Sequence, residues 1–155
     1  MNKYIHLLLI LSLLSAQGNT DGQKDIIAMA DIEYKGISEG EAEKLHSWLQ
    51  SALTNSNAYT VTERAKVRKI LKEVKFQQTS GCVSQKCAVE AGQLIGATVM
   101  LLVDFDFDIL KEEMDIALNI VDVKTGSIRT SPKPRTFRGK KFRDIQNHIE
   151  KLIFD

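Results

Sequence analysis

The two cysteines of this 155-residue chain, Cys82 and Cys87, are spaced for a structural bond rather than for redox chemistry. Redox-active pairs usually follow the pattern C-x-x-C, whereas four residues separate these two cysteines. The first residues of the chain predict export, as described below, and an exported chain with two cysteines usually pairs them. We therefore expect a Cys82–Cys87 disulfide that closes a short loop and contributes about 2 kcal/mol to stability.

Three carboxylates, Asp104, Asp106 and Asp108, alternate along the chain and would project from one face of a strand. Such a row suggests calcium, but Ile109 stands where a calcium-binding EF-hand loop needs glycine. Two phenylalanines alternate with the carboxylates, which is typical of a strand with one buried face. We interpret the row as a solvated strand edge whose charges discourage aggregation.

Motifs that would indicate an enzyme are not found in the sequence. His46 and His148 lie on predicted helices, and neither has a second histidine four residues away to help bind zinc. We find no nucleophile elbow, no phosphate-binding loop and no paired catalytic carboxylates. We therefore expect no catalytic residue, no cofactor and no metal, and we classify the protein as non-catalytic.

The strongest asymmetry of charge runs from residue 124 to residue 143, where eight basic residues stand with no Asp or Glu between them. An ordinary solvated face is one reading of this run, and contact with an anionic lipid or an acidic partner is the other. Nucleic acid is not an expected partner, because the net charge is only +1 and few aromatic residues interleave. The residues that we assign to such a contact are Arg135, Arg138, Lys140, Lys141 and Arg143.

Residues 1–18 have the features of a cleavable signal peptide, with a basic start, an apolar run over residues 7–14 and small residues after it. A retained membrane-anchoring helix is the alternative, although the run is shorter than the ~20 residues that span a bilayer. We expect cleavage after Ala16 or Gly18. Because Gln17 stands where a lipoprotein signal has cysteine, we expect no lipid anchor. We expect a periplasmic or secreted protein and leave open a peripheral association with the outer membrane.

Hydrophobic patterning predicts one α/β domain over residues 25–155, after a linker at residues 19–24. Apolar runs, period-two alternation and β-branched residues indicate strands at 25–34, 58–62, 97–107, 114–123 and 127–130, the last of them resumed after Pro132 and Pro134.

Apolar residues at three- and four-residue spacing predict the helices of this domain. The first begins at Ser38, which forms a capping box with Glu41, and ends near Asn55. A second follows Arg64, a third starts at a Ser84 cap, and a last one covers residues 142–153. The order βαβααβββα predicts a mixed sheet of about five strands with three to four packed helices.

Short segments spread from residue 26 to residue 128 carry a family resemblance. They are IAMADIE at 27–33, VTER at 61–64, ILKE at 70–73, FQQTSGC at 76–82, CAVEAG at 87–92, LIGA at 94–97 and VDVKTG at 121–126. In order and spacing they resemble the CsgG-type family of bacterial envelope proteins, the family of the curli assembly and transport component. Its domain is related to the amino-terminal domain of TolB and to lipoprotein activators of peptidoglycan synthases.

The resemblance implies a TolB amino-terminal-domain-like α/β fold and a non-catalytic periplasmic binding or assembly module of a cell-envelope machine, serving secretion or the cell wall. It implies an envelope protein as the partner. One alternative is a homo-oligomeric subunit of a ring-forming, CsgG-like outer-membrane secretion complex, although the chain has no spare length for long membrane hairpins. The second alternative is an unrecognised envelope hydrolase, which predicts a pocket of titratable groups with shifted pKa values.

Overall fold

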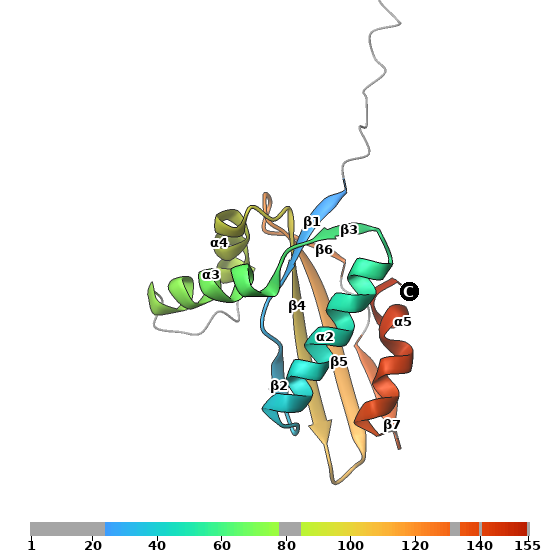
Figure 1. The fold of residues 1–155 in the computed structure, drawn as a ribbon. Helices are drawn as coiled ribbons and strands as arrows, with labels where there is room; N and C mark the ends of the chain where they lie inside the picture. Colours follow the sequence, from blue (N-terminus) through green and yellow to red (C-terminus); the bar gives the residue numbers. More distant parts are fainter. Residues whose placement is uncertain (1–23, 78–84, 131–133, 140, 155) are drawn as a thin grey trace, which may run out of the picture.

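The computed structural model describes residues 24–77, 85–130, 134–139 and 141–154, and the statements below concern these residues. The expected signal peptide, most of the linker and the expected Ser84 cap lie outside them. A mixed sheet lies between two layers of helices (Figure 1). This arrangement confirms the predicted α/β class.

The sheet is built from seven strand segments that occupy five positions side by side across the sheet. We call each of these positions a lane. The segments are β1 (Asp25–Met29), β2 (Glu33–Lys35), β3 (Tyr59–Val61), β4 (Val99–Asp108), β5 (Glu113–Asp122), β6 (Ile128–Thr130) and β7 (Arg135–Arg138). Their order is β3-β1-β4-β5-β6, with β2 also beside β4 and β7 also beside β5. The lanes of β3, β1–β2 and β4 are parallel, whereas β5 runs antiparallel to β4 and to β6 and β7.

Helices cover both faces of the sheet. They are α2 (Glu39–Asn55), α3 (Arg64–Gln77), α4 (Gln85–Ile95), the 3-10 helix η1 (Phe142–His148) and α5 (Ile149–Phe154). The first half of the predicted last helix, Phe142–His148, is therefore 3-10 rather than α. Among the described residues, no helix has both the length and the apolar character needed to span a bilayer.

Alternation along β4 distributes its side chains between two cores. Val103 and Phe105 pack with α2 and α5, whereas Met100 packs with α3 and α4. On the second face α4 lies very close to the sheet, because a Cβ atom at Gly92 would lie only 2.5 Å from Cγ2 of Val123. The sheet is thus fixed between two apolar layers.

The acidic row lies on the half of the second face that α3 and α4 leave open. Asp104 and Asp106 are exposed, opposite to the buried Phe105. The expectation of a strand edge is wrong, because β4 is a central strand that pairs with β2 on one side and β5 on the other. Alternation indicated correctly which face these carboxylates occupy, but it carries no information about the lane.

The single strand predicted over residues 25–34 is broken into β1 and β2. Met29 pairs with Leu101 and Glu33 pairs with Asp104, so four steps along this lane match three steps along β4. The lane therefore contains one extra residue, in the manner of a β-bulge. The break at residues 30–32 separates the two segments and lies beside the functional site described below.

The predicted start of α2 is confirmed. The backbone N–H of Glu41 donates to Ser38 Oγ at 3.3 Å, and the backbone N–H of Ser38 donates to a carboxylate oxygen of Glu41 at 2.9 Å. The two residues thus satisfy each other's free N–H groups at the helix end. The hydrogen bond from the Ser38 backbone is the main cause that lowers the pKa of Glu41.

A polar clamp joins the first strand to the second half of the chain. Arg129 bridges Asp25 and Asp122, with nitrogen–oxygen distances of 2.6 Å to both carboxylates. Thr98 Oγ1 donates to Asp25 at 2.7 Å and accepts from the backbone N–H of Ile26. The backbone N–H of Thr125, and then the Arg129 guanidinium, lower the pKa of Asp122 to about 2.

Candidate functional site

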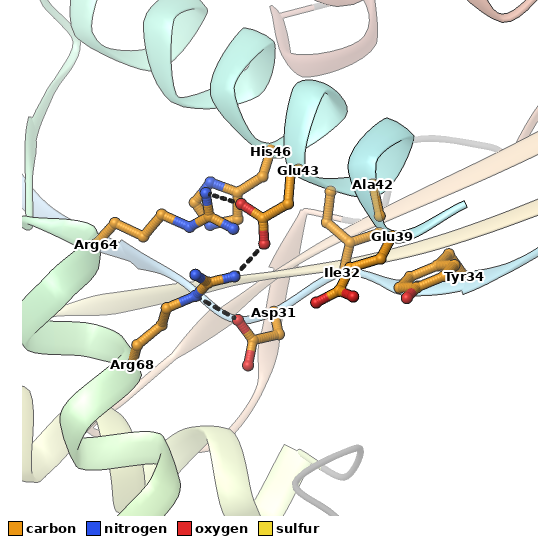
Figure 2. A pocket seen from close by; sticks show the side chains of 9 residues that line it. All are labelled: Asp31, Ile32, Tyr34, Glu39, Ala42, Glu43, His46, Arg64 and Arg68. Carbon is orange, nitrogen blue, oxygen red and sulfur yellow. Dashed lines mark hydrogen bonds and ion pairs between the residues drawn. The ribbon is translucent and has the colours of Figure 1, made fainter. Parts of the chain in front are cut away.

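A charged cleft opens between α2 and α3, beside the break between β1 and β2 (Figure 2). Its volume is about 230 Å³. The side chains that line it are Asp31, Ile32, Tyr34, Glu39, Ala42, Glu43, His46, Arg64 and Arg68.

Local geometry explains why the charged side chains meet in this cleft. Glu43 and His46 are three residues apart on α2 and therefore share one face of that helix. Arg64 and Arg68 are four residues apart on α3 and also share a face. Asp31 comes from the β1–β2 break and completes the cluster from the sheet side.

Two arginines and two carboxylates form one continuous ion-pair network. Arg64 lies 2.5 Å from a carboxylate oxygen of Glu43, and Arg68 donates to the other oxygen. Arg68 also contacts Asp31 at 3.4 Å. The hydrogen bond from Arg64 is the largest cause that lowers the pKa of Glu43, and the hydrogen bond to Glu43 raises the pKa of Arg68. The network links side chains of α2 and α3, which cover opposite faces of the sheet, beside the break between β1 and β2.

His46 lies behind this network and is almost completely buried, with 3% of its surface exposed. Burial, followed by the neighbouring charge of Arg64, lowers the pKa of His46 to about 4. The imidazole is therefore neutral at pH 7. Its Nδ1 atom and the Nε atom of Arg64 are buried and have no hydrogen-bond partner among the described residues.

The cleft has the shifted pKa values that the hydrolase alternative predicts, but their directions favour a structural role. The carboxylate of Glu43 is held ionised, the guanidinium of Arg68 is held protonated and His46 is held neutral. Tyr34 supplies the only hydroxyl among the residues that line the cleft. A hydrolytic nucleophile or a general base that titrates near neutral pH is not provided by this arrangement.

Within the described residues, no group of three or more His, Cys, Asp or Glu side chains is placed to hold a metal ion. His46 lies on α2 and lines the charged cleft, whereas His148 lies on η1 and does not line it. The row Asp104, Asp106 and Asp108 gives no such group either.

A second concavity, which we call the aromatic groove, has a volume of about 580 Å³ and lies between α2 and η1. Its floor is aromatic, because the rings of Trp48 and Phe142 stack with their centroids 5.3 Å apart. Charged residues border the floor. The lining consists of Glu41, Lys44, Trp48, Phe107, Lys141, Phe142, Arg143 and Asp144.

The structure divides the predicted basic contact set into two groups. Lys141 and Arg143 line the aromatic groove. Arg135 and Arg138 lie on β7, a short strand at the edge of the sheet, and Arg138 pairs with Glu113 at 2.7 Å. Lys140 lies outside the described residues. Whether these residues contact an anionic partner stays a prediction.

The predicted Cys82–Cys87 disulfide also stays a prediction, because Cys82 lies outside the described residues. Cys87 lies on α4 and is fully buried against the second core, which includes Val67 and Ala88.

The charged cleft and one exposed apolar loop were not found by sequence reasoning. The hydrophobic pattern indicates only that Arg64 and Arg68 lie on the polar face of a helix. His46 was considered only as a zinc ligand. The four-residue spacing of the arginines was visible, but their partner Glu43 is on another helix. Ile109 and Leu110, at the turn between β4 and β5, are exposed. The sequence signal for this exposed loop was the pair of adjacent aliphatic residues directly after a row of carboxylates.

The fold defines an α/β domain of the type found in the solved structures of TolB and of the LpoB C-terminal domain. The family model of the peptidoglycan-synthase activator LpoB matches residues 1–130. The chain therefore belongs to the LpoB family of peptidoglycan-synthase activators. A comparison with curated proteins finds none that matches.

Solved structures share the fold at low sequence identity. The C-terminal domain of LpoB from Salmonella enterica is 17% identical with a TM-score of 0.55, over 84% of this chain and 93% of that one. Lipoprotein GNA1162 from Neisseria meningitidis is 13% identical with a TM-score of 0.58, over 83% and 94%. TolB from Acinetobacter baumannii is 10% identical with a TM-score of 0.52, over 85% of this chain and 28% of that one.

These matches refine the expected family. They support an envelope protein with a TolB-like fold and an activator family, but they do not support a CsgG-type protein. The secretion role kept as an alternative is likewise not supported, whereas homo-oligomerisation stays a prediction. A family of synthase activators agrees with the expected non-catalytic accessory role.

Proposed function

We propose that this protein is a non-catalytic activator that binds a peptidoglycan synthase on the periplasmic side of the cell envelope. The match of the synthase-activator family over residues 1–130 carries this proposal. The charged cleft supports it, because the ionised groups Glu43, Arg64 and Arg68 are already paired with one another. Their role is to link α2 and α3 beside the β1–β2 break, which leaves binding to the outer surface of the domain.

We further propose that the β7 edge forms part of the synthase contact. Arg135 is exposed on this edge strand and makes no ion pair within the described residues. Arg138 lies on the same strand but is held by Glu113. An exposed, unpaired guanidinium on a sheet edge is suited to a carboxylate-bearing surface of a protein partner.

A periplasmic location would require export of the chain. We propose that residues 1–18 act as the signal peptide and that cleavage follows Ala16 or Gly18. N-terminal sequencing of the protein recovered from the envelope fraction is then expected to begin at Gln17 or Asn19. Recovery of an intact N-terminus would contradict cleavage but would leave the activator role standing.

The activator role is tested with the full chain and the purified peptidoglycan synthases of the same organism. We expect a saturable increase in the rate of glycan polymerisation by one synthase, and direct binding to that enzyme. If no synthase is bound or stimulated at any concentration of the chain, the proposal is wrong.

The β7 contact is tested with Arg135→Glu. Because a repulsive charge replaces an attractive one at an exposed contact, we expect affinity for the synthase to fall about tenfold. Lys124→Glu is the matched control, since Lys124 is exposed and belongs to the same basic run but lies in the turn between β5 and β6. Equal affinities of the two variants would exclude the β7 edge as the contact.

A further inference from the structure

The turn between β4 and β5 exposes two aliphatic side chains that a monomer leaves in water. Ile109 is 72% exposed and Leu110 is 93% exposed. Apolar surface in water costs about 25 cal/mol per Å², so the pair gains free energy when a partner covers it. We call residues 104–115, the distal part of this hairpin, the finger.

The finger is a defined shape. The strands β4 and β5 pair without interruption from Val99 with Asp122 to Asp108 with Glu113. At the turn, Asp108 Oδ1 accepts from the backbone N–H groups of Leu110 at 3.0 Å and of Lys111 at 3.2 Å. The ammonium of Lys111 closes the turn at 2.8 Å from the other oxygen of Asp108.

The finger is also strongly acidic. It contains six carboxylates and one lysine, a net charge of −5. Lys111 pairs with Asp108, and Arg138 pairs with Glu113. The carboxylates of Asp104, Asp106 and Glu112 make no ion pair within the described residues. The partner of the finger should therefore offer an apolar surface with a basic border, which argues against an anionic membrane surface.

The aromatic groove of this same chain has that chemistry. Its stacked Trp48 and Phe142 rings form an apolar floor, and Lys44, Lys141 and Arg143 supply positive charge beside it. The two carboxylates in its lining already accept hydrogen bonds from backbone N–H groups of their own helix ends. Glu41 accepts from the backbone N–H of Ser38, and Asp144 accepts from that of Lys141 at 2.9 Å.

We propose that the finger of one copy docks into the aromatic groove of a second copy. Phe107 lines the groove and stands two residues before Ile109 on the same hairpin, so finger and groove lie at the same end of the molecule. Two copies related by a two-fold axis can then exchange contacts, each finger entering the other groove. Such an isologous contact closes on itself and gives a dimer.

This self-association is tested without the synthase, by sedimentation equilibrium of the full chain over a range of concentrations. We expect a monomer–dimer equilibrium that weakens as salt is added, because the contact joins opposite charges. Leu110→Ser should weaken the dimer at least about tenfold. Leu94→Ser is the matched control, because Leu94 is 61% exposed but lies on α4, outside both surfaces.

A charge exchange tests the pairing of finger and groove directly. Glu112→Lys on the finger and Arg143→Glu in the groove should each weaken the dimer, and both substitutions in one chain should restore it in large part. Both side chains are exposed, so the fold should persist, and circular dichroism checks this.

Three outcomes would overturn the proposal. The first is a wild-type chain that stays monomeric up to about 100 μM, a concentration at which a dimer with a micromolar dissociation constant forms. The second is a dimer whose dissociation constant is unchanged by Leu110→Ser. The third is assembly that continues beyond the dimer. A monomer that binds anionic vesicles through Leu110 falls under the first outcome. None of these results bears on synthase stimulation, so the two proposals fail separately.

Discussion

The buried imidazole of His46 makes folding sensitive to pH. Its pKa is about 4 in the folded protein, against 6.5 for an ordinary histidine. The unfolded chain therefore binds more protons than the folded chain between these values. Stability is complete above about pH 6.5 and is lost as the pH falls toward 4.

Urea unfolding at several pH values checks this effect. We expect wild type to lose about 2 kcal/mol of unfolding free energy between pH 7 and pH 5 from His46 alone. His46→Leu should lose much less, and it should be more stable than wild type at pH 5 because no buried Nδ1 is left without a partner. Parallel pH profiles for the two proteins would show that His46 does not titrate in this way.

At this scale the sequence indicated residue types better than their partners. The eight basic residues between positions 124 and 143 were visible as one run, but the structure assigns Arg135 to the β7 edge and Arg143 to the aromatic groove. Glu43 and Arg64 are separated by 21 positions, and nothing local connects them. Pairing across elements depends on the fold and could not be read from periodicity.

Among the elements, the connection between α3 and α4 carries the predicted disulfide. If Cys82 and Cys87 are bonded, Cys82→Ser should lower the unfolding free energy by about 2 kcal/mol, because the closed loop restricts the unfolded chain. Reduction of the wild type should cause a similar loss and should leave the variant unchanged. An equal stability of oxidised wild type and variant would contradict the bond.

Elements defined by neighbouring residues were predicted well. The Ser38–Glu41 capping box starts α2 where expected, because both partners lie within one helical turn. The break between β1 and β2 could not be predicted, since Ala30 and Ile32 are buried and continue the apolar pattern of a single strand. Only the register of the neighbouring β4 reveals the extra residue.

For the whole molecule, the composition and the order of the elements were sufficient to predict the class of fold. A sheet of about five strands was predicted, and the seven strand segments of the structure occupy five positions across the sheet, because the number of apolar segments indicates the number of strands. The lane of each strand was not predicted. The carboxylates of Asp104 and Asp106 were assigned to an edge, although β4 lies between β2 and β5. Strand order depends on contacts between distant segments, and one sequence does not reveal them.

The polar clamp of Asp25 with Arg129 joins residues that are 104 positions apart. A ribosome that has made the first 98 residues has produced β1, β2 and β3 but none of the later strands that complete the sheet. The three residue pairs of β1 and β3 form a two-stranded sheet, which is marginal by itself in water. Until β4, β5 and Arg129 have been made, β1 and β2 lack the partners that they have in the folded sheet. Late folding of this kind would keep a newly made chain unfolded long enough to be threaded through an export channel.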